Sequence, residues 1–267
     1  MEPCVIALGF FDGLHLGHQR VIGEARKIAD EKNLPLAVMS FFPHPQVVLS
    51  DGKKNIQYLM PVMDKQKSLE GLGVDRCYLI KFDNEFAALS PKQFVEQYLL
   101  DFKAVHVVAG FDFTYGCRGA GHIDSLEEDA DMQFRVTKVN KVECRGKKIS
   151  STLIREKISL GEMESIPDYL GQCYQIEGKV SVSKNKVTFN ASPHYQLPAE
   201  GIYEVTVFED GHRWMQVVEV VNHSLYFYLD ENQERLLEGQ LVRIRFEKER
   251  FLTNDRSPEN RRNAVLI

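Results

Sequence analysis

The sequence predicts an α/β fold with a parallel sheet in its first part and a small antiparallel β-domain in its second part. Short apolar runs alternate with amphipathic helical patterns up to about residue 170, which is typical of β-α-β units. After about residue 172 the helical patterns stop and strand-like runs follow one another. Because 267 residues are ample for two domains, we expect one domain over residues 1–170 and another over 171–267.

The elements of the first part follow from its apolar periodicity. Strands are expected at residues 5–8, 36–42, 76–82 and 104–109, and helices at 18–32, 62–72 and 91–100. One face of the first helix carries Val21, Ile22, Ala25, Ile28 and Ala29. Ser90 and Pro91 supply the N-cap and first position of the third helix. This alternation predicts helices on both faces of the sheet and a ligand site at the carboxyl ends of its strands.

The second part contains six short runs with strand character. These strands are expected at residues 178–183, 186–191, 202–208, 214–221, 224–229 and 241–247. Asp210 and Gly211 form a hairpin-turn signal between two of them. The pattern predicts a small antiparallel barrel or sandwich. The polar residues 253–263 are expected to form a terminal helix or a disordered tail.

Composition excludes several classes of protein. The net charge of -5 argues against nucleic-acid binding by bulk electrostatics. The apolar run at residues 4–8 is too short for a signal peptide, and no segment approaches the roughly 18 apolar residues of a membrane span. Five cysteines without C-x-x-C spacing indicate reduced thiols. We expect a cytoplasmic protein without nucleic-acid or membrane partners, and nothing in the sequence specifies an oligomeric state.

The segment from Gly9 to His18 (GFFDGLHLGH) lies between the first expected strand and the first expected helix. Gly9, Gly13 and Gly17 allow tight turns and a close approach to a ligand. A helix that begins near Gly17 directs free N–H groups and a positive dipole end at a phosphate. His15 and His18 can flank that phosphate and stabilise charge in a transition state. The alternative is a glycine-rich turn with two exposed histidines, which this combination of residues disfavours.

Three further motifs follow later in the first part. Residues 41–45 (FFPHP) form a proline-fixed loop that can border a flat ring, although such turns are also common structural features. Residues 110–116 (GFDFTYG) place Asp112 at the mouth of a strand, where it can accept hydrogen bonds from a sugar or base, or bind Mg²⁺. Residues 150–155 (SSTLIR) open a helix that forms either a second anion site with Arg155 or an ordinary N-cap.

In their order, GFFDGLHLGH, FFPHP, GFDFTYG and ISSTLIR resemble the motifs of prokaryotic FAD synthetases, adenylyltransferases that are often fused to riboflavin kinase. Residues 160–171 (LGEMESIPDYLG) are similar to the segment that leads into the kinase module of that family. The resemblance covers residues 1 to about 175. It implies a Rossmann-like nucleotidylyltransferase domain and a riboflavin-kinase-like β-barrel, with transfer of AMP from ATP to FMN to give FAD and pyrophosphate.

The resemblance also assigns roles to individual positions. It implies that His15, His18 and Arg155 are catalytic, the two histidines stabilising the pentacoordinate α-phosphorus. Ser151, Thr152 and Arg155 would hold the departing β- and γ-phosphates. The other implied ATP contacts are Gly9, Phe10, Asp12, Gly17 and Asp112, and the implied FMN contacts are Phe42, Pro43, His44 and Pro45. Mg²⁺ would shield charge, and positioning and electrostatics would dominate because no covalent intermediate is needed.

The second part departs from the family pattern. A kinase module similar to its relatives would carry a glycine-rich loop ending in PTAN, a later GxRPT segment and a glutamate base. Residues 178–192 (GKVSVSKNKVTFNAS) lack that loop, no GxRPT segment follows, and Ser224 stands near the position of the glutamate. We therefore expect a kinase-like barrel without kinase activity.

Three other interpretations stay open. The chain can be a bifunctional riboflavin kinase and FAD synthetase. It can be a related transferase for another phosphate-bearing substrate, such as nicotinamide mononucleotide or pantetheine phosphate, which the FFPHP loop and the barrel disfavour. It can also be a non-enzymatic, flavin-responsive binding protein, but such a protein has no need of His15, His18 and Arg155.

Overall fold

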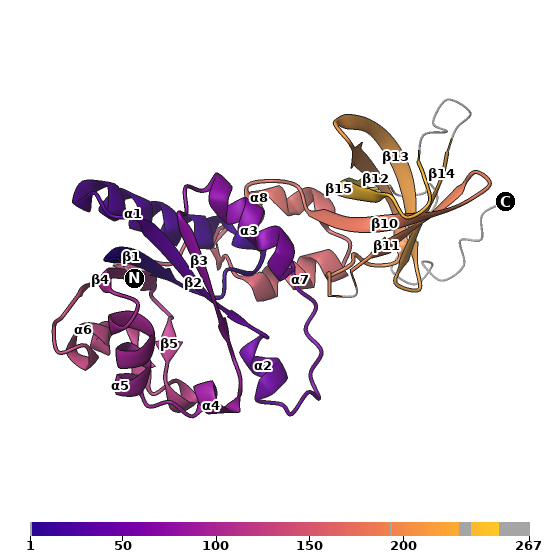
Figure 1. The fold of residues 1–267 in the computed structure, drawn as a ribbon. Helices are drawn as coiled ribbons and strands as arrows, with labels where there is room; N and C mark the ends of the chain where they lie inside the picture. Colours follow the sequence, from indigo (N-terminus) through magenta and orange to yellow (C-terminus); the bar gives the residue numbers. More distant parts are fainter. Residues whose placement is uncertain (1, 193, 230–235, 251–267) are drawn as a thin grey trace. The chain divides into compact units, whose positions relative to one another are not determined.

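The computed structural model describes residues 2–192, 194–229 and 236–250, which fold into two compact units (Figure 1). The first unit takes in the chain up to Arg155 together with residues 168–171 and 194–196. The remaining described residues form the second unit. Three separate segments of the chain therefore make up the first unit. The assignment of residues 1–170 and 171–267 to separate domains stays a prediction.

A five-stranded parallel sheet forms the centre of the first unit, in the order β3-β2-β1-β4-β7. Its strands are β1 (Cys4–Leu8), β2 (Leu36–Phe42), β3 (Arg76–Lys81), β4 (Ala104–Gly110) and β7 (Arg135–Val139). The strand order reverses at β1, because β2 and β3 lie on one side of it and β4 and β7 on the other. The carboxyl ends of the strands beside such a reversal are where ligands bind in open parallel sheets.

Helices cover both faces of this sheet, as the alternating pattern predicted (Figure 1). On one face, Val5 and Ala7 pack into a core with α1 (Leu16–Lys32) and α3 (Val62–Gly71). On the other face, Ile6 and Leu8 pack with α5 (Pro91–Phe94), the π-helical turn that continues it (Val95–Leu100), and α6 (Leu126–Asp129). Successive strand residues point to opposite faces, so a fully buried strand such as β1 serves both cores.

Local capping explains where these helices start and stop. Ser90 and Gln93 form a reciprocal capping box at the start of α5. Asn33 ends α1 in the left-handed conformation that asparagine tolerates well. The shorter elements of the chain are α2 (Pro45–Val48), α4 (Asn84–Ala87), α7 (Ser151–Ser159), α8 (Pro167–Leu170), β5 (Thr114–Tyr115), β6 (Gly121–His122), β8 (Glu143–Cys144) and β9 (Lys147–Lys148).

The second unit contains a closed antiparallel barrel in the order β10-β11-β14-β13-β12-β15. Its strands are β10 (Gln175–Ser183), β11 (Lys186–Ala191), β12 (Gly201–Glu209), β13 (His212–Val221), β14 (Ser224–Tyr228) and β15 (Leu241–Glu249). Alternate side chains, among them Val180, Phe189 and Ile244, are fully buried inside it. The structure thus decides for a barrel over a sandwich. The expected tail element at residues 253–263 lies outside the described residues.

Candidate active site

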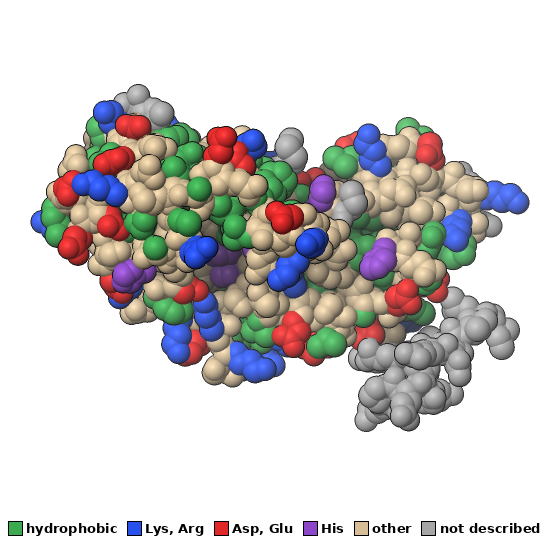
Figure 2. Space-filling model, turned by 90° about the horizontal axis from the view of Figure 1, so that it is seen from below, with side chains coloured by type: hydrophobic (Ala, Val, Ile, Leu, Met, Phe, Trp, Pro, Cys, Tyr) green, Lys and Arg blue, Asp and Glu red, His purple; other side chains and the backbone are tan. Residues whose placement is uncertain are grey.

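A cavity of about 880 Å³ lies at the carboxyl ends of the parallel strands in the first unit. Its walls come from the segments that follow β1, β2, β4 and β7 and from the start of α7. This is the position that the reversal of strand order predicts for a ligand, and the volume is typical of a cofactor site. Figure 2 shows a histidine side chain recessed in the surface of this unit, with a basic side chain beside it.

The cavity gathers most of the residues that the sequence singled out. Those that line it are Gly9, Phe10, Asp12, His15, Gly17, His18, His44, Pro45, Asp112, Ser151, Thr152 and Arg155. Phe42 and Pro43 are not among the lining residues. The ring of Phe42 lies instead against Tyr58, with 5.9 Å between the centroids. The roles of all these residues toward ATP and FMN stay predictions.

His15 and His18 form a stacked pair at the start of α1. Their ring centroids are 3.6 Å apart and the ring planes differ by 15°. His15 is the N-cap of the helix, and its Nδ1 accepts a hydrogen bond of 3.2 Å from the backbone N–H of His18. A Cβ atom on Gly17 would lie 3.0 Å from the His15 ring, so glycine at this position leaves room for the stacked arrangement.

Burial keeps both imidazoles neutral. Burial, with a smaller contribution from the nearby Lys148 cation, lowers the pKa of His15 to about 4. Burial also holds the pKa of His18 well below its usual range, with smaller contributions from His15 and Lys65. Because Nδ1 of His15 is an acceptor, its proton is carried by Nε2. Nδ1 of His18 is buried and has no hydrogen-bond partner among the described residues.

Asp12 connects three separate segments at one edge of the cavity. Its carboxylate accepts hydrogen bonds from the backbone N–H groups of Leu59 (3.2 Å) and Met60 (3.0 Å), and it forms an ion pair with the Arg155 guanidinium. Ser151 Oγ donates to the backbone carbonyl of Asp12 at 2.9 Å. Asp12, a fully buried residue, therefore holds the start of α7 against the loop after β1. This positioning contribution is not what the resemblance assigned to Asp12.

Asp112 forms an ion pair with Lys148, whose ammonium also lies 4.8 Å from the ring centroid of Phe111. Sequence reasoning missed Lys148, although it directly precedes the ISSTLIR motif and lines the cavity. The signal that can reveal it is a basic residue just before a Ser/Thr-rich helix start. Among the described residues, no group of three or more histidine, cysteine, aspartate or glutamate side chains could hold a metal ion.

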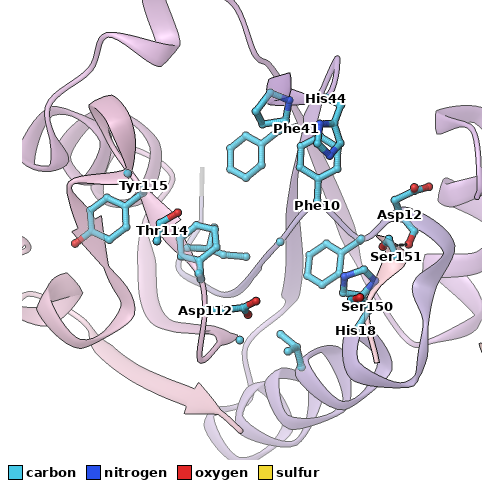
Figure 3. A pocket seen from close by; sticks show the side chains of 18 of the residues that line it. Phe10, Asp12, His18, Phe41, His44, Asp112, Thr114, Tyr115, Ser150 and Ser151 are labelled. Carbon is cyan, nitrogen blue, oxygen red and sulfur yellow. Dashed lines mark hydrogen bonds between the residues drawn. The ribbon is translucent and has the colours of Figure 1, made fainter. Parts of the chain in front are cut away.

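Aromatic side chains form another part of the cavity wall. The Phe10 ring lies 4.5 Å from that of His44, and Figure 3 shows Phe10, Phe41 and His44 together, away from His18, Ser150 and Ser151. Further aromatic lining comes from Phe82, Phe86, Phe94, Phe111, Phe113 and Tyr115. Sequence reasoning did not single out Phe86 and Phe94, since aromatic residues on helices resemble ordinary core residues.

A buried lysine supports the floor of the site. Lys65 on α3 is 4% exposed, and its Nζ donates to the carbonyl of Phe10 (2.9 Å) and to Ser40 Oγ (3.2 Å). Ser40 Oγ donates to the same carbonyl at 2.9 Å. Burial lowers the pKa of Lys65, and among the described residues it forms no ion pair with a carboxylate. Two donors thus fix the backbone of Phe10, which sequence periodicity did not predict.

The FAD synthetase family model matches residues 1–153. The chain belongs to the FAD synthetase family. This membership confirms the resemblance drawn from the four motifs. A solved structure titled macrolide-efflux protein from Streptococcus pneumoniae aligns with this family member over 94% of both chains, with 28% identity and a TM-score of 0.84. No helix in the described part of the chain is long and apolar enough to cross a membrane.

Curated relatives of this family member carry two kinds of name. A bifunctional riboflavin kinase/FMN adenylyltransferase of Listeria monocytogenes is 43% identical over 209 residues, covering 75% of this chain and 67% of the relative. A protein of the same name from Bacillus subtilis is 41% identical over 245 residues, covering 89% of this chain and 77% of the relative. A protein of Listeria monocytogenes named only FAD synthetase is 31% identical over 204 residues, covering 76% and 81%.

Proposed function

We propose that this protein transfers AMP from ATP to FMN, giving FAD and pyrophosphate, and that it does not phosphorylate riboflavin. One observation carries the proposal. A single cavity joins the stacked pair of His15 and His18 and the Arg155-bearing helix start to an aromatic wall around Phe10 and His44. Polyphosphate and a flat flavin ring need these two environments side by side.

In this proposal the triphosphate lies at the starts of α1 and α7. Neutral imidazole N–H groups of His15 and His18 donate to oxygens of the α-phosphate and stabilise the charge that develops there. Ser151, Thr152 and Arg155 bind the β- and γ-phosphates. A phosphate oxygen of FMN attacks the α-phosphorus, a new P–O bond forms, and the bond to the bridging oxygen breaks as pyrophosphate leaves.

FMN is placed by the aromatic part of the cavity, with Phe10, His44 and Pro45 beside the ring system. The family implies Mg²⁺. Because the described residues hold no metal site of three or more histidine, cysteine, aspartate or glutamate side chains, the ion would bind mainly through ATP phosphates, with Asp112 as a carboxylate that lines the cavity. When bound, Mg²⁺ supplies neutralisation of phosphate charge. Cytoplasmic localisation and the absence of nucleic-acid and membrane partners belong to the same proposal.

The absence of kinase activity is supported by the hairpin at residues 178–191. Strands β10 and β11 pair continuously from Gly178 with Ala191 to Ser183 with Lys186, which leaves a two-residue turn. Val187 and Phe189 fill the barrel interior. A phosphate cradle needs several unpaired N–H groups in one loop, and here the corresponding stretch is a strand ladder.

The test is a chromatographic assay of the purified chain with ATP and Mg²⁺, supplied with either FMN or riboflavin. The Bacillus subtilis relative, run in parallel, is the control for both steps. We expect FAD and pyrophosphate from FMN, and neither FMN nor FAD from riboflavin. Unchanged FMN would refute the adenylylation, and riboflavin consumption at a comparable rate would refute the missing kinase step.

A further inference from the structure

Residues 194–196 are a short segment between two barrel strands that belongs to the first unit. β11 ends at Ala191 and β12 begins at Gly201, both in the second unit, while residues 194–196 pair with Tyr58. We call residues 194–196 the return segment. Tyr58 N–H donates to the carbonyl of His194 at 2.6 Å, and Gln196 N–H donates to the carbonyl of Tyr58 at 2.8 Å.

Tyr195 anchors the return segment. Its side chain is 4% exposed, and its hydroxyl donates to the carboxylate of Asp64 in the first turn of α3. The backbone of Tyr195 forms a parallel bridge with Tyr58. The segment is therefore fixed at two points, to a backbone strip on one side and to a helix start on the other.

That backbone strip, residues 57–60, is in direct contact with the candidate active site. Arg155 Nε donates to the carbonyl of Gln57 at 2.9 Å. The next N–H groups along the strip bind the Asp12 carboxylate, which in turn pairs with Arg155. The hydroxyl of Tyr58 accepts a hydrogen bond of 3.0 Å from the backbone N–H of His44. Tyr58, which pairs with the return segment, thus binds His44 through its own hydroxyl. Its two neighbours in the chain, Gln57 and Leu59, bind Arg155 and Asp12.

The strip is part of an irregular connection, and besides the contacts named above its Tyr58 and Leu59 are buried. It lies between α2, which ends at Val48, and α3, which begins at Val62, and this connection contains no regular helix or strand. Fixing such backbone costs conformational entropy, which hydrogen bonds from a second segment can offset. A misplacement of about 1 Å in a catalytic group can lower a rate about 100-fold. A restraint on residues 57–60 can therefore affect the rate of the reaction.

We propose that Tyr195 is a positioning residue for adenylyl transfer, which rests on the function proposed above. Through residues 57–60 the return segment holds the Arg155 guanidinium in place for the departing phosphates. This gives the second part of the sequence a role in the reaction that needs no kinase chemistry. It is also a physical reason why the second part would matter for the reaction without the kinase activity that the proposal above denies it.

The test is a double-mutant cycle in the full-length chain between Tyr195→Ala and Arg155→Ala, measured as kcat for FAD formation from FMN. We expect Tyr195→Ala to lower kcat about tenfold in the wild-type background and less than twofold in the Arg155→Ala background, because coupled residues are not additive. Tyr195→Phe, which keeps the ring but loses the hydrogen bond to Asp64, should lower kcat by only about two- to threefold. Tyr228→Phe, at an exposed barrel tyrosine, is the control and should match wild type.

Thermal midpoints of all variants separate positioning from folding. If Tyr195 has a purely structural role, Tyr195→Ala lowers the thermal midpoint. In that case kcat, measured below the midpoint, is either unchanged or reduced by the same factor in the wild-type and Arg155→Ala backgrounds. Either result for kcat overturns the proposal. If Tyr195→Ala does not fold, the same cycle with Tyr195→Phe decides, and the proposal fails if that variant shows no loss that depends on Arg155. Wild-type protein that makes no FAD would refute the proposed function instead.

Discussion

The guanidinium of Arg155 donates to the carboxylate of Asp12, although 143 positions of sequence separate the two residues. The Asp12 side chain is 2% exposed and the Arg155 side chain 19%, so this is a largely desolvated ion pair. Removing one partner of such a pair leaves an uncompensated buried charge. Both the stability of the protein and the placement of Arg155 therefore depend on this pair.

We expect Asp12→Ala to lower the free energy of unfolding by about 3 kcal/mol and FAD formation at least about tenfold. Urea denaturation and the FMN assay measure the two effects. Asp30→Ala is the matched control, since Asp30 forms an exposed i,i+4 pair with Arg26 and should change stability by less than about 1 kcal/mol. Equal destabilisation by the two variants would contradict the importance of the buried pair.

His18→Ala should lower the rate of FAD formation by about two orders of magnitude or more, the usual loss when one preorganised donor to a transition state is removed. The KM for ATP should change by a smaller factor, because the donor is aimed at charge that develops during reaction. Steady-state kinetics with varied ATP measure both. If rate and ATP affinity fall equally, His18 serves ground-state binding alone.

Two glycines of α1 provide a matched pair of substitutions. Gly17→Ala places a methyl group 3.0 Å from the His15 ring and should displace it, lowering FAD formation about tenfold. Gly23→Ala meets no atom within 4 Å and should stabilise the protein by about 0.5–1 kcal/mol with unchanged activity. Activity assays and thermal midpoints of both variants test this. Full activity of Gly17→Ala would show that the His15 ring is not confined as described.

Stability should fall as the pH is lowered from 7 to 5. The pKa of His15 is about 4 in the folded protein, and that of His18 is also lowered, against 6.5 for an ordinary histidine. Between these values the unfolded chain binds more protons than the folded one, so the stabilisation is complete above pH 6.5 and is lost as the pH falls toward 4. Each histidine can contribute up to about 1.4 kcal/mol per pH unit.

Urea midpoints at pH 5, 6 and 7 measure this dependence. The double variant His15→Asn with His18→Asn should show a clearly flatter profile over the same range. A double variant as pH-sensitive as wild type would assign the effect to other groups.

The sequence predicted every strand of the five-stranded sheet except the edge strand β7. Strand β1 is apolar throughout because both faces are buried, and such runs are easy to recognise. In β7 (RVTKV) only Val139 is buried, and its polar and apolar residues do not form a longer apolar run. The sequence also did not predict the contacts of Lys65 and Asp12 within the site. One is a charged residue on a helix and the other lies in a glycine-rich motif, and their partners are 55 and 143 positions away.

By itself the sequence determined the α/β class, the order of the strands along the chain, the motifs that mark the FAD synthetase family and the residues placed at strand ends. These follow from local patterns, because side-chain periodicity and glycine, proline and histidine spacing are properties of short segments. Only the tertiary structure decided that Asp12 restrains Arg155, that Phe42 lies outside the cavity, and that residues 194–196 pair with Tyr58. Such contacts join segments far apart in the chain, and their geometry exists only once the sheet order and loop paths are fixed.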